Sequence, residues 1–305
     1  MKTFKELGVK DFILKSFKEQ NITEPTEIQE KTITLVNKGK DVIGGSATGS
    51  GKTIAFGSGI IQNAEKGKGI QAIVLCPTRE LALQVTKAFK RISKYKPLGI
   101  TTIYGGVSIN PQIEKLKKVE IVVGTPGRIL DHIGRHTINL KKVKTVVLDE
   151  ADIMLDMGFI EDIEKIIREC PKKRQTLLFS ATISSLINRL TKNYMHNPVK
   201  VSVESKVDPK KLTQVYYDTP NNLKFSLLVH LLKSGERGLV MVFTNTRANT
   251  DFVANNLENN GIKATAIHGG LTQQKRTDVM KHFHSKDVFV LVCTDVAARG
   301  LDIKG

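Results

Sequence analysis

The sequence predicts an α/β protein built on doubly wound parallel sheets, and three observations lead to this fold class. Short apolar runs recur along the chain, and both faces of each run are apolar, which is typical of strands covered by helices on both sides. Amphipathic patterns with helical spacing lie between these runs. Glycine, threonine, serine and aspartate follow the runs, at the carboxyl ends of the predicted strands. Ligands bind at that edge of an open α/β sheet, so the pattern predicts a binding site there.

Each predicted strand is a run of branched apolar residues that ends in small or polar residues, as in QAIVLCP and TVVLDE. The segments between the strands repeat apolar residues every three or four positions, as Leu81, Val85 and Phe89 do, which predicts helices. The predicted strands are 41–45, 71–77, 100–106, 120–126, 145–150, 175–181, 238–245, 262–270 and 288–295.

The predicted elements fall into two parts. Residues 203–214 lack apolar periodicity and carry Pro209 between charged residues, which predicts a linker. We therefore expect a first domain over 1–204, a linker over 205–211 and a second domain over 212–305. The second part holds few strands and is short for an α/β layer, so we expect it to be incomplete.

Charge and composition narrow the classes of partner. The 305 residues carry a formal net charge of +17 and a pI near 9.7, which indicates a polyanionic partner such as nucleic acid. A solvated lysine-rich surface is the alternative that charge alone leaves open. The three cysteines are far apart and form no CxxC pair, which argues against a disulfide scaffold or a zinc site. No apolar run reaches membrane-spanning length, and we expect a cytoplasmic protein with no membrane partner.

The segment SATGSGKT, residues 46–53, has the composition of a phosphate-binding loop between a strand and a helix. Its glycines let the backbone wrap a phosphate with the N–H groups aimed inward, and the following helix offers its positive end. Lys52 is placed to reach the β- and γ-phosphates, and the Thr53 hydroxyl to ligate magnesium. A glycine-rich turn with a chance Lys-Thr is the alternative. The predicted phosphate-binding residues of this loop are Ser46, Ala47, Thr48, Gly49, Ser50, Gly51, Lys52 and Thr53.

Two adjacent carboxylates, Asp149 and Glu150, end a buried apolar run. Acid at the mouth of a buried sheet is costly unless a cation or hydrogen bonds compensate. We expect these carboxylates at the end of a strand that neighbours the P-loop strand, facing the same crevice. Asp149 would hold magnesium, usually through water, and Glu150 would orient and deprotonate the water that attacks the γ-phosphate. Lys52, Asp149 and Glu150 are the predicted catalytic residues, and a solvated strand end is the alternative.

Motifs along nearly the whole chain occur in the order found in one known family. The chain resembles the DEAD-box ATP-dependent RNA helicases of helicase superfamily 2. This resemblance implies two RecA-like doubly wound parallel-sheet domains, the second incomplete, with ATP and magnesium as cofactors and RNA as partner. The motifs are EPTEIQ (24–29), SATGSGKT (46–53), PTREL (77–81), GG (105–106), TPGR (125–128), DEAD (149–152), SAT (180–182), FTNTR (243–247), QQKR (273–276) and TDVAARGLD (294–302).

The resemblance assigns further residues to ATP. Gln29 belongs to a segment that resembles the Q motif, and its amide offers the donor and the acceptor that the edge of adenine requires. Phe4 is the expected adenine-stacking residue, and a core position beside Leu7 and Phe12 is the alternative. The nucleotide contacts implied are Phe4, Pro25, Thr26, Gln29 and, when the two domains close, Gly300 and Asp302.

The resemblance also implies RNA contacts and a coupling motif. Arg79 and Arg128 would bind phosphates, so little sequence preference is expected, and a surface ion pair is the alternative for each. The hydroxyls of Ser180 and Thr182 would hydrogen-bond the acidic motif and couple hydrolysis to strand separation. The implied RNA contacts are Pro77, Thr78, Arg79, Gly105, Gly106, Thr125, Gly127, Arg128, Asn245, Gln273, Arg276 and Thr294, and the coupling residues are Asp152, Ser180, Thr182 and Arg299.

The function implied is ATP-gated closure of two domains that locally unwinds a short RNA duplex or remodels an RNA–protein complex. A DNA-directed enzyme of the same superfamily is one alternative. A truncated, nucleotide-dependent RNA-binding module without normal ATP turnover is the other. The second alternative rests on the family's final motif, of the form HRxGRxGR, which the sequence does not reach before Gly305. A fragment of a longer helicase is the favoured explanation.

Overall fold

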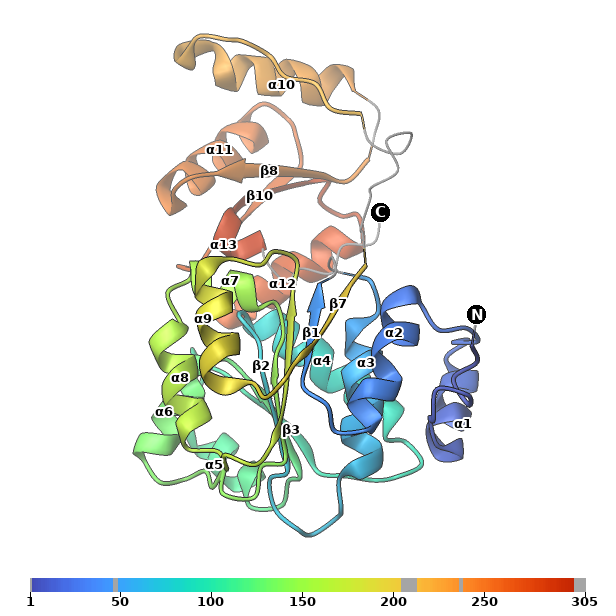
Figure 1. Cartoon of the computed structure of the whole chain (residues 1–305). Helices are drawn as coiled ribbons and strands as arrows, with labels where there is room; N and C mark the ends of the chain where they lie inside the picture. The colour runs from blue at the N-terminus through green and yellow to red at the C-terminus, as the bar shows by residue number, and fades with distance from the viewer. Residues whose placement is uncertain (1, 46–48, 204–212, 236–237, 299–305) are drawn as a thin grey trace. The chain divides into compact units, whose positions relative to one another are not determined.

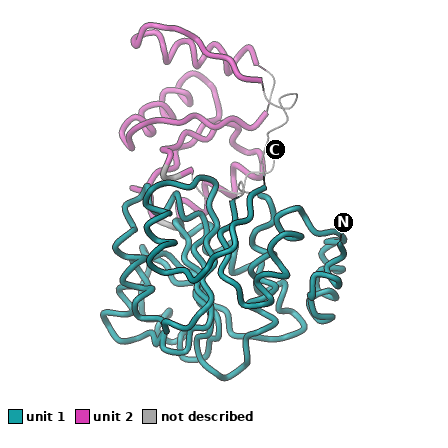
Figure 2. The backbone as a smooth tube through the Cα atoms, viewed as in Figure 1, with its two compact units in different colours: residues 1–206 teal, residues 207–305 magenta. Residues whose placement is uncertain are grey.

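The computed structural model describes residues 2–45, 49–203, 213–235 and 238–298 of the chain. The chain divides into two compact units, residues 1–206 and residues 207–305 (Figure 2). Each unit is described by itself. The linker predicted over 205–211 lies outside the described residues.

The first unit is built on a parallel sheet whose described strands number seven, in the order β3-β4-β2-β5-β6-β1-β7. Figure 1 labels β1, β2, β3 and β7 of this sheet. Every strand predicted before residue 182 is present. Strand β7 was not predicted, because its alternating sequence VKVS lies at the sheet edge and is mostly exposed. The strands are β1 Val42–Gly45, β2 Ala72–Leu75, β3 Ile100–Ile103, β4 Ile121–Gly124, β5 Thr145–Leu148, β6 Gln175–Ser180 and β7 Val199–Ser202.

Helices cover both faces of this sheet, which is why its inner strands are apolar on both sides. Successive strand residues alternate between two cores, as Ile73 and Val74 do. Helices α1 to α4 pack into the core that contains Val74, and α5 to α9 into the core that contains Ile73. The helices are α1 Asp11–Glu19, α2 Glu27–Asn37, α3 Lys52–Asn63, α4 Arg79–Ile92, α5 Asn110–Leu116, α6 Pro126–Gly134, α7 Ala151–Asp156, α8 Ile160–Arg168 and α9 Ser185–Tyr194.

The second unit repeats the plan on a smaller scale, with a parallel sheet in the order β8-β10-β9 among its described residues. Helix α11 packs on one face through Leu257, and α12 packs on the other through Phe283. All three strands predicted here are present. The elements are α10 Lys224–Ser234, β8 Val240–Thr244, α11 Arg247–Asn259, β9 Ala264–Ile267, α12 Gln273–His284, β10 Val290–Thr294 and α13 Asp295–Ala298, with a 3₁₀ turn at Asn221–Leu223. In the described parts of both units, no helix has the length and apolarity needed to cross a membrane.

Candidate ATP and RNA site

The predicted phosphate-binding loop joins β1 to α3, and its second half is described. Gly49 and Gly51 have φ values of 81° and 92°, a left-handed backbone that favours glycine. Helix α3 begins directly afterwards at Lys52, whose side chain is 7% exposed. The positive end of α3 therefore faces the loop, as an anion site requires. Ser46, Ala47 and Thr48 lie outside the described residues.

The Q-motif residues Thr26 and Gln29 hold this loop from the side. The Gln29 side-chain amide donates to the carbonyl oxygen of Gly51 at 3.0 Å, and the Thr26 hydroxyl donates to that of Ser50 at 2.8 Å. The Gln29 carbonyl oxygen accepts from the Thr26 backbone N–H at 3.0 Å, which completes a capping box at the start of α2. A Cβ atom at Gly51 would lie 2.3 Å from the Gln29 nitrogen, so any other residue there would displace the Gln29 amide from its bond to the loop.

These bonds give Gln29 a role that the sequence did not predict. The adenine contact expected of it stays a prediction, because one amide hydrogen and one lone pair remain. Pro25 is buried just before α2. Phe4 is only 4% exposed, and its ring centroid lies 4.8 Å from that of Phe17 in the α1–α4 core. This burial favours the core position for Phe4 over the expected stacking on adenine, since little of the ring face is accessible.

Asp149 and Glu150 follow β5 and are 2% and 5% exposed. The expectation that their strand neighbours the P-loop strand was wrong, because β6 lies between β5 and β1. Parallel strands still bring all three carboxyl ends to one edge of the sheet, with Ser180 of β6 in register with Gly45 of β1. Glu150 has a φ of 52°, so the chain turns sharply between strand β5 and helix α7.

Electrostatics link Asp149 to the P-loop. Burial raises the pKa of Asp149 from 3.8 to about 6, while the positive charge of Lys52 opposes that rise and Glu150 adds to it. One carboxylate oxygen of Asp149, Oδ1, is buried and has no hydrogen-bond partner among the described residues. A buried carboxylate oxygen beside a phosphate-binding loop fits a hard cation such as magnesium, which takes oxygen ligands. The Thr53 hydroxyl, in the first turn of α3, is the other ligand predicted there.

Asp152 ties the acidic motif to the loop after β6. Its Oδ2 atom accepts hydrogen bonds from the backbone N–H groups of Ala181 and Thr182, at 3.1 and 3.0 Å, and from the Thr182 hydroxyl at 3.2 Å. The Ser180 hydroxyl accepts from the Asp152 backbone N–H at 3.3 Å. The predicted hydrogen bonds between these hydroxyls and the acidic motif are therefore present. Their part in coupling stays a prediction.

The predicted RNA-binding residues of the first unit gather on the loops after β2, β3 and β4. Thr78 caps α4 by accepting from the Leu81 N–H, and Pro77 precedes it. The Arg79 guanidinium lies 4.2 Å from the centroid of the Tyr104 ring. A Cβ atom at Gly106 would lie 3.8 Å from Arg79, so the two loops meet closely. Tyr104 was missed by the sequence analysis, although its place one residue before Gly105 was a usable signal.

The loop after β4 joins the same group. Arg128 is largely buried and donates to the carbonyl oxygen of Val107 at 2.9 Å. It also lies 3.6 Å from Asp131, so the ion pair considered as its alternative is present. Thr125 is the N-cap residue of α6, and Gly127 has open space beside it. Pro77, Thr125 and Gly127 carry no contact that shows their predicted role.

In the second unit, Asn245 and Thr294 lie at the carboxyl ends of adjacent strands, because Thr294 is in register with Thr244 of β8. Arg276 lies in the first turns of α12. The side chain of Gln273 and the predicted residues Arg299, Gly300 and Asp302 lie outside the described residues. Buried His268 contacts Asp251 of α11 at 3.0 Å and accepts from the Gly270 N–H at 3.1 Å, so it ties the loop after β9 to that helix.

The sequence analysis gave no role to Arg247, which begins α11 after the capping residue Thr246. A Cβ atom at Gly269 would lie 3.5 Å from Arg247. This arrangement repeats Thr78 and Arg79 beside the glycine pair of the first unit. The repeated Thr-Arg at the start of a helix was the signal that could have identified it.

The fold and these sites define a P-loop protein with two repeated α/β units, the first of which carries buried carboxylates beside its phosphate loop. The family profile described as "DEAD/DEAH box helicase" matches residues 26–190, and "Helicase conserved C-terminal domain" matches residues 223–305. The chain belongs to the DEAD/DEAH box helicase family.

Individual relatives agree with this assignment. The chain is 47% identical over 305 residues to "ATP-dependent RNA helicase CshA" of Limosilactobacillus reuteri, covering 99% of this chain and 61% of the relative. It is 47% identical over 308 residues to "DEAD-box ATP-dependent RNA helicase CshA" of Bacillus anthracis, covering 100% of this chain and 58% of the relative. The chain therefore spans about three fifths of the length of these curated relatives.

Solved structures of the family share the fold. A DEAD box protein from Methanococcus jannaschii is 43% identical, with a TM-score of 0.65, and the match covers 99% of this chain and 82% of that one. Saccharomyces cerevisiae Dbp5 bound to RNA and ADP BeF3 is 31% identical, with a TM-score of 0.89, and the match covers 99% of this chain and 78% of that one.

Proposed function

We propose that the chain is the ATP- and RNA-binding part of an ATP-dependent RNA helicase that unwinds short duplexes locally or remodels RNA–protein complexes. The observation that carries this proposal is the buried Asp149 beside Lys52 at the carboxyl edge of the sheet. A carboxylate with an unpaired buried oxygen needs a cation, and a P-loop lysine needs phosphate. The CshA relatives are named as ATP-dependent RNA helicases, and the Dbp5 structure holds RNA and a nucleotide, which supports the same reading.

The residues of the first unit divide the chemistry among them. Lys52 and the N-terminus of α3 would hold the phosphates, while Thr53 and Asp149 would hold magnesium, partly through water. Bound magnesium supplies charge neutralisation at the phosphate oxygens. Glu150 would orient the attacking water and accept its proton. Gln29 and Thr26 would keep the loop in shape through their bonds to the carbonyl oxygens of Gly51 and Ser50.

The link from ATP to RNA would run through Asp152. Its three hydrogen bonds fix the loop at Ala181 and Thr182, so a shift of the acidic motif must move that loop. RNA would lie along Arg79, Gly106 and their counterparts in the second unit, and ATP and RNA would each favour closure of the two units. We propose the cytoplasm as the compartment in which the protein works, since both proposed ligands, ATP and RNA, would be available there.

The test compares ATP binding with RNA-stimulated ATP hydrolysis in two variants. Glu150→Gln should still bind ATP but lose about 10²–10⁴-fold in hydrolysis, the usual contribution of a general base. Lys52→Ala should lose ATP binding itself. Glu161→Gln, the same chemical change at an exposed position on α8, is the matched control and should behave as wild type. If the wild type hydrolyses ATP, hydrolysis by Glu150→Gln at the control's rate would overturn the assignment of the base.

The same measurement separates the alternative function. A nucleotide-dependent RNA-binding module would show RNA affinity that rises with ATP while no phosphate is released by the wild type. Stimulation of hydrolysis by DNA and not by RNA would overturn the choice of nucleic acid.

A further inference from the structure

A hollow of about 620 Å³ lies on the outer side of α4, beside the edge strand β3. Thr86 and Thr102 line it, and the Thr102 hydroxyl donates to that of Thr86 at 2.8 Å. The exposed side chain of Leu83 lies at the part nearest the start of α4. Four cationic residues complete the lining, namely Lys87, Lys90, Arg91 and Lys94.

Within the described part of the chain, one of these four cations has an acidic partner. Lys94 pairs with Glu19 of α1 at 2.6 Å. Lys87, Lys90 and Arg91 are exposed, and no ion pair engages them among the described residues. Like charges at neighbouring positions of one helix face repel one another, so this arrangement costs stability unless an anion compensates. The hollow is therefore a candidate anion site.

The cations continue the row that begins with the predicted RNA contact Arg79. Arg79, Leu83, Lys87 and Lys90 follow one another at spacings of four, four and three residues, which places them on one face of α4. From Arg79 to Lys90 the helix rises about 16 Å. An RNA strand bound at Arg79 and Gly106 would therefore lie at one end of this row of cations on α4.

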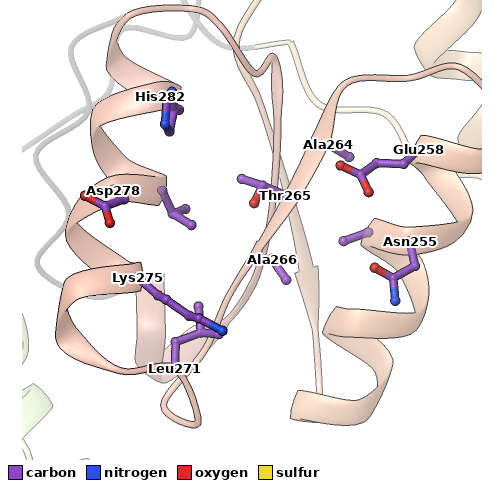
Figure 3. A pocket seen from close by; sticks show the side chains of 11 residues that line it. Asn255, Glu258, Ala264, Thr265, Ala266, Leu271, Lys275, Asp278 and His282 are labelled. Carbon is purple, nitrogen blue, oxygen red and sulfur yellow. The ribbon is translucent and has the colours of Figure 1, made fainter.

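The second unit shows that the fold does not impose this charge. Counted from the first residue of each helix, Lys87 of α4 corresponds to Asn255 of α11, and Lys90 corresponds to Glu258. Both counterparts line a pocket of about 350 Å³ beside β9 (Figure 3). Figure 3 shows Asn255 and Glu258 on one side of the strand and Lys275, Asp278 and His282 on the other. The same part of the fold thus carries a carboxylate in the second unit, and in the first unit a row of cations for which the described residues provide no ion pair.

We propose that the outer face of α4 is an accessory RNA-binding surface, which holds the sugar-phosphate backbone beyond the nucleotides bound at Arg79. This inference rests on the proposed function, because it extends the RNA path. Lys87, Lys90 and Arg91 contact phosphates, and Leu83 packs against ribose or base. These contacts recognise the charge of the phosphates and make no hydrogen bond to base edges. The surface therefore increases the number of nucleotides bound without adding sequence preference.

The spacing favours RNA over an acidic peptide. The cations form a single line along a helix that starts at another nucleic-acid contact, and a polyanion with regular charges can follow such a line continuously. An acidic protein segment is the alternative occupant, and it requires no dependence on RNA length.

The experiment measures the affinity of the chain for single-stranded oligouridylates of increasing length, at several salt concentrations. The variant combines Lys87→Ala, Lys90→Ala and Arg91→Ala. The control combines Lys165→Ala, Lys172→Ala and Lys173→Ala, which removes three exposed positive charges at and after α8, on the opposite face of the sheet. Wild type and control should gain affinity with length beyond the shortest RNA that binds, and the variant should lose that gain. The slope of log affinity against log salt for long RNA should fall by about 2, as three lost phosphate contacts require.

The single charge reversal Lys90→Glu places in α4 the residue type found at the same position of α11. It should remove most of the increase in affinity with RNA length. If the triple variant keeps the gain, or if it loses affinity for the shortest RNA as much as for long RNA, the accessory surface is wrong while RNA binding stands. If the wild type binds no RNA of any length, the proposed function itself fails.

Discussion

The first unit arranges β3, β4 and β2 in the same spatial order in which the second unit arranges β9, β10 and β8. A Thr-Arg pair starts the helix α4 after β2 and the helix α11 after β8, and in both helices the threonine hydroxyl accepts from a backbone N–H in the first turn. In both units this arginine lies close to a glycine pair that follows the edge strand. The two units therefore repeat one strand–helix framework for presenting the predicted RNA contacts.

The units differ in what lies beyond that framework. In the first unit, β5, β6 and β1 continue the sheet past β2, and these strands carry the carboxylates, Ser180 and the phosphate loop. In the second unit, no further strand is paired beyond β8 among the described residues, Phe243 of β8 is 56% exposed, and α10 has no buried residue. Under the proposed function, the shared framework would hold the nucleic acid, whereas the chemistry on ATP would be carried out at β5, β6 and β1 of the first unit.

Replacing one aromatic residue in each unit should give the largest difference between them. Phe179 of β6 is fully buried, 5.3 Å from Phe56 between ring centroids, and Phe179→Ala should cost about 3–5 kcal/mol of unfolding free energy. Phe252 of α11 is 58% exposed, and Phe252→Ala should cost at most about 1 kcal/mol. Hydrogen exchange with mass spectrometry follows each unit separately. Equal losses of protection in the two units would break the comparison.

The buried carboxylate should make the first unit sensitive to pH. Because the pKa of Asp149 is raised to about 6, the folded state holds that proton more tightly than the unfolded state does. This tighter proton binding contributes fully to the stability of the folded state below pH 3.8, and the contribution is lost as the pH rises through about 6. At pH 7, without nucleotide or magnesium, Asp149→Asn should therefore stabilise the first unit, by at most about 3 kcal/mol.

The control for that prediction is the same variant near pH 4, where wild type and Asp149→Asn should unfold alike. Thermal unfolding at both pH values, in the presence of a chelator, checks the difference. A destabilised Asp149→Asn chain at pH 7 would mean that hydrogen bonds to the ionised carboxylate outweigh the cost of its burial.

The strands could be predicted because a strand buried on both faces requires a continuous apolar run. Nine such runs identified nine of the described strands. Strand β7 lacked the signal because it is an exposed edge strand. An apolar run shows that a segment is a strand but not which strands lie beside it in the sheet. The position of β6 between β1 and β5 therefore could not be predicted.

Only part of the candidate site could be predicted from the sequence, because a sequence pattern shows local motifs and not the contacts between distant segments. Lys52, Asp149 and Asp152 could be proposed as site residues because each belongs to a short motif, and their roles stay predictions. The bond from Gln29 to the Gly51 carbonyl depends on how α2 packs against α3, and the burial of Phe4 depends on its contact with Phe17. Contacts between segments that are distant in sequence require the packed structure.

The smallest predicted effect tests the repeat itself. Thr78→Ala and Thr246→Ala each remove one capping hydroxyl. These hydroxyls accept from the backbone N–H groups of Leu81 and Asn249, at 3.3 Å and 3.1 Å. Each change should lower the unfolding free energy of its own unit by about 1 kcal/mol. Both changes also loosen the start of the helix that positions Arg79 or Arg247, so RNA affinity should fall by a similar small factor in each. Thr191→Ala, near the end of α9 and away from these loops, is the control for loss of a helical threonine hydroxyl. If only Thr78→Ala weakens RNA binding, the second unit repeats the framework in its backbone without sharing its role.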